Sequence, residues 1–368
     1  MHQKKYRVGI IGSTGRGDYG HAVDVAFLKV AQTQVVAVTD SDEVGREKAK
    51  KRLGIDNAYA DYRQMIDREK LDIVAICPRW IDQHYDMLMA AASAGCHIYM
   101  EKPYCRTLEE CDAVGNQIDM RHLKLAIAHI SVYSPVFQTV QKIISDGTIG
   151  DLLEIRGRGK EDRRGGGEDL WVLGSHVFSM MQKIGGKPFQ CSATVSQGGQ
   201  PVNKTHVKPG AEGIGPLAGD HVQAAYDFPN SVTGFFASRK GMGGNPTRFA
   251  IQIFGSKGII EIESGYGVPG YILQDSSWSP GRSAAKWEKI SSAGIAVEET
   301  ATNLTYEGGH IAAIRDLIHA IETHQDTLCN HRDSTGIIEM IAAVFESLRV
   351  AKPVSMPLMT RVNPLTLL

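Results

Sequence analysis

Glycines are concentrated where the first apolar stretch of the chain ends. Residues 9–17 read Gly-Ile-Ile-Gly-Ser-Thr-Gly-Arg-Gly. At a turn from a strand into a helix, such glycines let backbone amides and the positive end of the helix dipole approach a diphosphate. Gly12 and Gly17 match the first and third glycines of the dinucleotide-binding pattern Gly-x-Gly-x-x-Gly, but Thr14 holds the second position. The stretch is therefore either a diphosphate-binding loop or only a tight turn.

An acidic residue ends the next apolar stretch. Asp40 follows Val35–Thr39 and lies 23 residues after Gly17, close to the interval of about 20 that dinucleotide-binding folds use. A carboxylate there accepts hydrogen bonds from the adenosine ribose and repels a 2′-phosphate, which favours NAD over NADP. The alternative is that Asp40 caps a helix, with Ser41 and Asp42 as rival caps.

A charged pair ends a later apolar stretch. Glu101 and Lys102 follow His97–Met100 directly. In an open α/β sheet, ligands lie at the carboxyl ends of the strands, so both side chains are expected at a binding cleft. A lysine cation there can polarise a substrate oxygen, but it acts as a base only if burial or a neighbouring charge lowers its pKa.

A single histidine ends a glycine-rich stretch in the second half of the chain. Residues 165–176 read Gly-Gly-Gly-Glu-Asp-Leu-Trp-Val-Leu-Gly-Ser-His. Three successive glycines suit either a flexible linker or a place where the backbone comes close to another group. His176 lies among apolar residues, so it is either a buried structural histidine or a proton acceptor with an ordinary pKa of about 6.5.

The first 130 residues alternate between apolar stretches and amphipathic ones. The expected strands are Arg7–Gly12, Val35–Asp40, Asp72–Pro78, His97–Pro103 and Lys124–Ile130. The expected helices between them include Tyr85–Ala94 and Leu108–Asp119, the second opened by Thr107 and Glu110 at capping-box spacing. This alternation is typical of a Rossmann fold, a doubly wound parallel sheet with helices on both faces.

After residue 150 the chain reads as short strands joined by turns. The expected strands are Leu152–Arg156, Cys191–Ser196, His221–Phe228, Ser231–Ser238, Arg248–Phe254 and Gly258–Ile262. Helices are expected at Trp171–Lys183, His310–Thr323 and Ser334–Ala351, and a long loop at Gly198–Gly219. The pattern predicts an α+β domain with a large, mainly antiparallel sheet, whose open face is expected to pack against another subunit. We expect a dinucleotide-binding domain in residues 1–130 and a substrate-binding and oligomerisation domain in 131–368, and leave open whether the last helices pack back on the first domain.

Composition limits the class of protein. A chain of 368 residues with 42% hydrophobic and 22% charged residues is expected to form two ordinary globular domains. The formal net charge of -1 provides no basic field for nucleic acid or for an anionic membrane. No apolar run approaches the roughly 18 residues of a membrane span, and no signal region opens the chain. The scattered histidines and cysteines favour no metal site, and the six cysteines read as reduced thiols in a cytoplasmic protein.

These features together resemble the family of glucose-fructose oxidoreductase, inositol dehydrogenase and rhizopine catabolism protein MocA. The resemblance rests on Gly12–Gly15, Asp40, Glu101–Pro103 and His176. It extends over nearly the whole chain, through His84, Ala91–His97, Asp146–Gly150 and Pro353–Pro357.

The resemblance implies transfer of hydride between NAD, or alternatively NADP, and a secondary hydroxyl or keto group of a sugar, glycoside or cyclitol. It implies that Lys102 is the catalytic lysine, that His176 acts beside it, and that subunits pair across the open sheet as a dimer or tetramer. The residues expected at the cofactor are Gly12, Ser13, Thr14, Gly15, Arg16, Asp40, Ser41, Cys77, Pro78, His84, Glu101 and Lys102. Those expected at the substrate are Lys102, His176, Trp80 and Trp171.

One position departs from the family's pattern, which places an aspartate four residues before the histidine. Here that position is Val172. Asp169 lies seven residues before His176, again on its face at helical spacing. Asp169 either takes the orienting role in catalysis or caps the helix; otherwise Lys102 and His176 work without a carboxylate.

Two other functions stay open. The same machinery can serve an NAD-dependent glycosidase or lyase, which oxidises the sugar transiently and then restores it. A dinucleotide-binding regulatory protein without catalysis is the other alternative. The missing acid at Val172 favours the regulatory protein, whereas the presence of both Lys102 and His176 opposes it.

Overall fold

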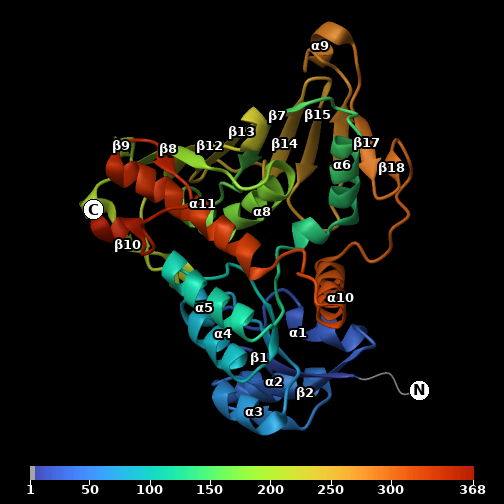
Figure 1. The fold of residues 1–368 in the computed structure, drawn as a ribbon, viewed down its shortest axis with the longest axis vertical. Helices are drawn as coiled ribbons and strands as arrows, with labels where there is room; N and C mark the ends of the chain where they lie inside the picture. Colours follow the sequence, from blue (N-terminus) through green and yellow to red (C-terminus); the bar gives the residue numbers. More distant parts are fainter. Residues whose placement is uncertain (1–4) are drawn as a thin grey trace. The chain divides into compact units, whose positions relative to one another are not determined.

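The computed structural model describes residues 5–368, which form two compact units (Figure 1). The first unit runs to Ala128 and takes in Ala211–Gly215 and Tyr306–Thr335. The second consists of His129–Gly210, Pro216–Thr305 and Gly336–Leu368. Two segments from late in the chain therefore belong to the first unit, which the sequence alone did not locate.

The first unit is built on a sheet of six parallel strands in the order β3-β2-β1-β4-β5-β6. These strands are β1 (Tyr6–Ile11), β2 (Thr33–Thr39), β3 (Asn57–Tyr59), β4 (Ile73–Ile76), β5 (His97–Met100) and β6 (Leu125–Ile127). Both faces are covered by helices, so β4 is buried along its whole length. The order reverses between β1 and β4, where doubly wound sheets bind their ligands. The predicted doubly wound sheet is confirmed, although the short strand β3 was not foreseen.

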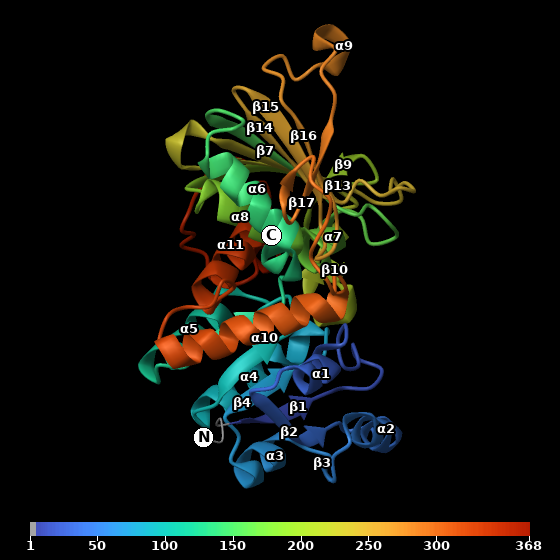
Figure 2. The same ribbon diagram turned by 90° about the vertical axis from the view of Figure 1, so that its right-hand side faces the viewer.

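Six helices accompany this sheet. They are α1 (Val23–Ala26), α2 (Glu43–Leu53), α3 (Tyr62–Glu69), α4 (His84–Ser93), α5 (Leu108–Met120) and α10 (Tyr306–Thr323), with 3-10 turns η1 (Phe27–Lys29), η2 (Ile81–Gln83) and η5 (Ala211–Gly213). Helix α5 begins where the capping pattern predicted, since Thr107 accepts the Glu110 N–H. Helix α10 packs against α1 and along β5 and β6 (Figure 2).

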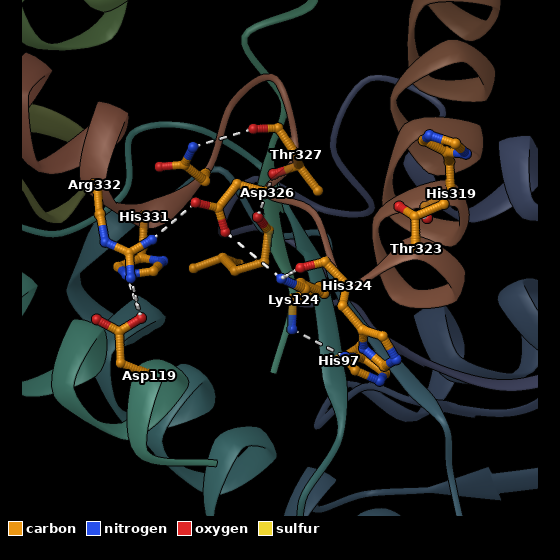
Figure 3. A network of polar contacts seen from close by, with 12 residues as sticks. His97, Asp119, Lys124, His319, Thr323, His324, Asp326, Thr327, His331 and Arg332 are labelled. Carbon is orange, nitrogen blue, oxygen red and sulfur yellow. Dashed lines mark hydrogen bonds and ion pairs between the residues drawn. The ribbon is translucent and has the colours of Figure 1, made fainter. Parts of the chain in front are cut away.

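The edge of the parallel sheet at β6 is covered by the connection between α10 and α11 (His331–Val350). The Ile127 N–H donates to the carbonyl oxygen of Cys329, and the Thr327 hydroxyl donates to that of Leu125. Lys124 reaches the same connection, with Nζ 2.9 Å from the carbonyl oxygen of His324 (Figure 3). These bonds attach a segment more than 180 residues further along the chain to the Rossmann fold.

The second unit holds a sheet of eleven strands in the order β18-β17-β16-β15-β14-β7-β13-β12-β8-β19, with β9 paired to β8. The strands are β7 (Leu152–Arg158), β8 (Gln190–Gln197), β9 (Gln200–Pro201), β12 (His221–Asp227), β13 (Thr233–Arg239), β14 (Ala250–Gly255), β15 (Gly258–Glu263), β16 (Gly270–Leu273), β17 (Glu288–Ser291), β18 (Gly294–Ile295) and β19 (Val354–Ser355). A separate pair joins β10 (Lys208–Pro209) to β11 (Pro216–Leu217). Strands β7 and β13 are parallel and the other pairs of the large sheet are antiparallel, so the predicted sheet type is confirmed.

One face of the large sheet is covered by helices (Figure 1). The covering helices are α6 (Pro135–Ser145), α7 (Gly167–Val172), α8 (Gly174–Gly185) and α11 (His331–Val350). The short helix α9 (Pro280–Ser283) lies apart from them, on the connection between β16 and β17. The turns of this unit are η3 (Ile130–Tyr133), η4 (Lys204–His206), η6 (Pro229–Ser231) and η7 (Pro364–Leu367). Phe178 of α8 packs its ring 4.9 Å from that of Phe236 and 5.6 Å from that of Tyr226. These large buried rings form the core between helix and sheet.

The prediction of a single helix at Trp171–Lys183 is wrong. Two helices, α7 and α8, occupy this stretch, and the break falls at Leu173. Gly174 opens α8 in a tight place, because a Cβ there would lie 3.1 Å from the Phe236 ring and 3.2 Å from the carbonyl oxygen of Asp169. The turn between the helices is therefore set by packing on β13, which helical periodicity does not reveal.

The other face of the large sheet contains a hollow of about 750 Å³. Arg156, Gln223, Phe235 and Glu261 are among the residues that line it. Within residues 5–368, no helix is long and apolar enough to cross a membrane. The same residues include no group of three or more histidine, cysteine, aspartate or glutamate side chains arranged to hold a metal ion.

Candidate functional site

The glycine loop after β1 is a closed hairpin whose amides are already engaged. Ser13 pairs with Asp18, and the Gly15 N–H donates to the Asp18 carboxylate at 2.9 Å. The Arg16 N–H donates to the carbonyl oxygen of Ser13 at 3.0 Å. The helix that follows, α1, has only four residues, so its dipole adds little at the loop. In this conformation the loop offers an anion fewer backbone amides than the sequence led us to expect.

Asp40 is buried and holds this loop. Its carboxylate accepts the Thr14 hydroxyl at 2.7 Å, the Thr14 N–H at 3.1 Å, the Tyr19 hydroxyl at 2.9 Å and the Asp42 N–H at 3.0 Å. Burial raises the pKa of Tyr19 well above its ordinary value, and the charge of Asp40 adds to this effect, so the hydroxyl stays a donor. Asp42 caps α2 through the Gly45 N–H. The cap is therefore neither Asp40 nor Ser41.

Tyr19 was missed by sequence reasoning. Its ring lies against Gly12, where a Cβ would come within 2.2 Å of a ring carbon. The first glycine of the loop thus makes room for an aromatic side chain of the same loop. The only local signal was one tyrosine among small and charged residues.

A cavity of about 150 Å³ opens beside the loop, at the carboxyl ends of β1 and β2. Its lining includes Gly12, Ser13, Ser41, Tyr62 and Gln83. An aromatic ring, two hydroxyls and an amide suit a nucleoside, which presents both a flat base and ribose hydroxyls. The residues at this place therefore fit the adenosine half of a dinucleotide, and the cofactor contacts expected of Ser13 and Ser41 stay predictions.

Glu101 and Lys102 follow β5 and are both buried, with Lys102 5% exposed. His21 was not predicted from the sequence. Its ring Nδ1 lies 2.9 Å from the Glu101 carboxylate, and its backbone N–H donates to the same carboxylate at 3.1 Å. Burial alone would raise the pKa of Glu101, but the bond from His21 and the charges of His21 and Lys102 outweigh it, so this pKa lies well below its usual range. Glu101 thus supplies a fixed negative charge next to Lys102.

His84 is fully buried, and its expected contact with the cofactor stays a prediction. Its Nδ1 lies 2.8 Å from the carbonyl oxygen of Pro103, and its Nε2 lies 2.8 Å from that of Pro78. Burial lowers the pKa of His84, although both carbonyl contacts act in the opposite direction. His84 therefore ties the backbone after β4 to the backbone after Lys102 and positions both.

Of the other residues of this unit that were expected at the cofactor or the substrate, Cys77 lies in the core, whereas Trp80 and Arg16 lie on loops. Cys77 is buried, with its thiol directed to the carbonyl oxygen of Ala75. Trp80 lies beneath the guanidinium of Arg16, 4.8 Å from the ring centroid. Trp80 and Arg16 are thus brought together at the end of the sheet where β1 and β4 stop.

In the second unit, His176 lies in the first turn of α8 between two other rings. The ring of His129 is 5.8 Å away, edge to face, and that of Phe249 is 6.5 Å away. His129 was not predicted as a site residue, although it lies within the expected strand Lys124–Ile130. Lys102 belongs to the first unit and His176 to the second, so their joint action is part of the proposal below.

Asp169 is fully buried but serves a different part of the second unit. Its Oδ2 accepts the Ser238 hydroxyl at 2.6 Å and the Glu161 N–H at 3.0 Å. Burial raises the pKa of Asp169, although both hydrogen bonds oppose the rise. The expected shared helical face with His176 is wrong because the helix breaks at Leu173, and the expected cap is wrong because Gly166 holds that position.

The three glycines before α7 are a place of close backbone approach. A Cβ on any of Gly165–Gly167 would lie between 2.3 and 2.5 Å from backbone atoms of residues 218–219 or 240. No side chain fits there, so the linker interpretation is wrong.

Trp171, expected at the substrate, is 2% exposed in α7. Its indole Nε1, the hydroxyl of Ser175 and Oδ1 of Asp169 are buried without a hydrogen-bond partner among residues 5–368. Buried polar atoms are usually satisfied by protein or by ordered water. The segment that ends at His176 thus has unused capacity for a polar ligand.

Comparison with known proteins finds a family match for each half of the chain. Residues 6–129 match the profile described as "Oxidoreductase family, NAD-binding Rossmann fold", and residues 142–356 match "Oxidoreductase family, C-terminal alpha/beta domain". The chain is 25% identical over 285 residues to levoglucosan dehydrogenase of Pseudarthrobacter phenanthrenivorans, covering 68% of this chain and 72% of that protein. It is 24% identical over 201 residues to the scyllo-inositol 2-dehydrogenase (NADP+) of Bacillus subtilis, covering 51% and 54%.

Solved structures show the same fold. Levoglucosan dehydrogenase in complex with NADH and L-sorbose superimposes with a TM-score of 0.78 at 20% identity, covering 97% of this chain and all of that one. Aldose-aldose oxidoreductase from Caulobacter crescentus, complexed with glycerol, has a TM-score of 0.73 at 18% identity, covering 96% and 100%.

Proposed function

Because the chain belongs to the oxidoreductase family that joins an NAD-binding Rossmann fold to a C-terminal alpha/beta domain, we propose that it is an NAD-dependent dehydrogenase. Its substrate is a secondary hydroxyl, or the matching keto group, of a sugar, glycoside or cyclitol. The observation that carries the proposal is Lys102, a nearly buried cation at the carboxyl end of β5 beside the ionised Glu101. The named relatives act on sugars and cyclitols, which supports the substrate class.

The cofactor is held at the carboxyl ends of β1 and β2. Ser13, Ser41 and Tyr62 line the cavity that takes the adenosine half. Asp40 places a negative charge beside that cavity, which disfavours a 2′-phosphate and makes NAD the cofactor rather than NADP. NAD, when bound, exchanges a hydride with the substrate carbon.

The protein itself handles the proton. A hydroxyl carbon that loses hydride leaves an oxygen that must also lose its proton, and the imidazole of His176 is suited to accept it near neutral pH. Lys102 donates a hydrogen bond to the same oxygen and stabilises its developing negative charge. His84 keeps the Lys102 backbone in place through the carbonyl oxygen of Pro103.

The experiment is substitution of Lys102 by alanine in the full chain. We expect hydride transfer to fall by about a hundredfold to a thousandfold, because a buried electrostatic donor to the reacting oxygen is lost. NADH binding, followed by its fluorescence, should remain within about threefold of the unmutated protein. The activity assay is nicotinamide absorbance over a panel of sugars, glycosides and cyclitols.

The other outcomes identify the alternative functions. Turnover of a glycoside with no net change in nicotinamide absorbance would indicate a glycosidase or lyase that oxidises its substrate only transiently. An unmutated protein that binds NADH but transforms nothing in the panel would indicate a regulatory protein.

We also propose that the open face of the large sheet pairs with the same face of a second copy. The hollow there offers the exposed ring of Phe235 together with charges of both signs, from Arg156 and Glu261. A surface with both signs of charge can match itself across a twofold axis.

None of the six cysteines forms a disulfide bond within the described residues 5–368, which supports the cytoplasm as the compartment.

A further inference from the structure

Two loops that each carry an arginine meet at the point where the sheet order reverses. Arg16 belongs to the loop after β1, and Arg79 lies three residues beyond the last residue of β4. Gly17 stands between them with φ +91°, and a Cβ there would lie only 2.3 Å from the backbone nitrogen of Arg79. The two loops can touch because residue 17 has no side chain. Their contact places both arginines beside the switch point at which doubly wound folds bind ligands.

The polar groups around this contact are not fully satisfied. The guanidinium of Arg16 stacks on Trp80 and forms an ion pair with Asp82. Nε of Arg16, Nε of Arg79 and Oδ1 of Asp82 are each buried with no hydrogen-bond partner anywhere in residues 5–368. A buried N–H without an acceptor is costly, so an unfilled acceptor position is indicated. Two guanidinium groups against one carboxylate leave one positive charge at this place.

Asp82 is held from its other side by a distant part of the chain. The turn η5 packs on η2, and a Cβ on Gly213 would lie 2.7 Å from Oδ1 of Asp82. Asp82 is thereby fixed between Gly213 and Arg16. The guanidinium of Arg16 is thus oriented before any ligand arrives, which lowers the entropy lost on binding.

The arginine pair lies next to the cavity that suits the adenosine half of a dinucleotide. Gln83 lines that cavity and is the chain neighbour of Asp82, while Ser13 lines it from the loop that carries Arg16. The amides of Ser13, Thr14, Gly15 and Arg16 are all donated to acceptors within the same unit. These four amides are therefore already engaged, whereas Nε of Arg16 and Nε of Arg79 are unpartnered donors at the same place within residues 5–368.

We propose that the guanidinium groups of Arg16 and Arg79 bind the diphosphate of the nicotinamide cofactor, taking the role that backbone amides have in an ordinary glycine loop. The inference rests on the proposed function and adds to it a residue, Arg79, that the glycine pattern does not contain. A guanidinium presents paired N–H groups that match two phosphate oxygens. A carboxylate or phosphate on the substrate has the same chemistry and is the other source of the anion.

The test compares ligands with and without phosphate on the full-length protein. ADP-ribose and adenosine are titrated calorimetrically into the unmutated protein and into Arg16→Gln, Arg79→Gln, Arg79→Lys and Arg121→Gln. Arg121 is the control because it is an exposed arginine whose guanidinium bonds only the neighbouring side chain of Gln117 among the contacts found in residues 5–368. Thermal unfolding of every variant checks that it is folded.

We expect Arg16→Gln and Arg79→Gln each to weaken ADP-ribose binding by about tenfold to a hundredfold, as is typical for the loss of a hydrogen bond to a charged group. Adenosine binding should stay within about twofold in both. Arg79→Lys should recover part of the loss because it keeps the charge, and Arg121→Gln should bind like the unmutated protein. If a glutamine variant is unfolded, the lysine variant and its ADP-ribose affinity still decide the question.

Equal ADP-ribose affinity in the folded Arg79→Gln variant would overturn the inference. If that variant instead raised the KM of an acidic sugar at unchanged ADP-ribose affinity, the anion would belong to the substrate and the cofactor assignment would be wrong. An unmutated protein that bound neither NADH nor ADP-ribose would refute the proposed function itself. Failure of the inference can therefore be distinguished from failure of the proposed function.

Discussion

Asp169 shows how a carboxylate that lies near a candidate catalytic histidine in sequence can bond to other parts of the structure. It lies in the segment that ends at His176, yet its hydrogen bonds run to the Ser238 hydroxyl and to the Glu161 N–H. A Cβ on Gly159 would lie 2.1 Å from its Oδ2. The side chain therefore fastens the loop after β7 to α7 and β13.

We predict that Asp169→Asn lowers the free energy of unfolding by about 1–2 kcal/mol, because a charged hydrogen-bond acceptor is lost. Ser238→Ala, which removes one donor to the same oxygen, should have a similar effect. Chemical denaturation of both variants measures it. Neither variant should change the shape of the pH profile of kcat.

The pH profile separates this role from a catalytic one. A carboxylate that orients His176 would change the pKa of that histidine when neutralised, and the profile of Asp169→Asn alone would then shift. Such a shift, with Ser238→Ala unchanged, would restore Asp169 to the mechanism.

Among the elements, the start of α7 is tightly constrained by its neighbours. Gly166 has φ +85° and ψ -134°, and a Cβ there would lie 2.5 Å from the carbonyl oxygen of Gly219. Gly241 also has a positive φ, +71°, but nothing lies within 4 Å of its missing Cβ. The two glycines therefore share a positive φ and differ in their surroundings.

We predict that Gly166→Ala destabilises the protein by about 2–4 kcal/mol, since backbone strain of about 1–2 kcal/mol is joined by the cost of overpacking. Gly241→Ala should cost only the strain. Equilibrium denaturation of the two variants measures the difference. Equal losses would mean that the backbone around Gly219 moves aside, and that the close approach is not what requires glycine.

The short helix α1 is a second element whose structure bears on a proposed role. Dinucleotide-binding loops ordinarily lead into a helix whose amino end favours phosphate. Here the helix has four residues, and the loop before it closes on itself through Ser13 and Asp18. Binding of the diphosphate by arginine side chains is consistent with both changes.

At the scale of the whole molecule, assembly is the property that the open sheet bears on most directly. Phe235 is 39% exposed in the middle of the large sheet, at the hollow that α6 and α8 leave uncovered. We predict that Phe235→Glu dissociates the oligomer, because the apolar ring is replaced by a carboxylate that loses its hydration when the two faces meet, a cost that its cross-strand neighbour Arg156 offsets only in part. Sedimentation velocity of the full-length protein measures the change in mass.

The control for assembly is Met120→Glu, an exposed methionine at the end of α5 in the first unit. This variant should keep the mass of the unmutated protein. A Phe235→Glu protein that also kept that mass would place the interface elsewhere or show that the protein is a monomer.

Sequence alone determined the features that depend on neighbours along the chain. Apolar stretches bounded by turns located β1, β2, β4 and β5, because a strand buried on both faces must be apolar throughout. The end of each strand then located Asp40, Glu101 and Lys102 at one edge of the sheet. The capping pattern at Thr107 placed the start of α5 correctly, since a cap involves only residues three apart.

Tertiary structure decided what depends on competition between distant groups. The carboxylate of Asp40 is engaged by Thr14 and Tyr19, and that of Asp169 by Ser238, which lies 69 residues away. Residues 211–215 and 306–335 joined the first unit because their contacts lie there. A pattern of residues states which groups can bond, but only the folded chain determines which acceptor lies within reach of each donor, and the arginine pair at Gly17 is visible only there.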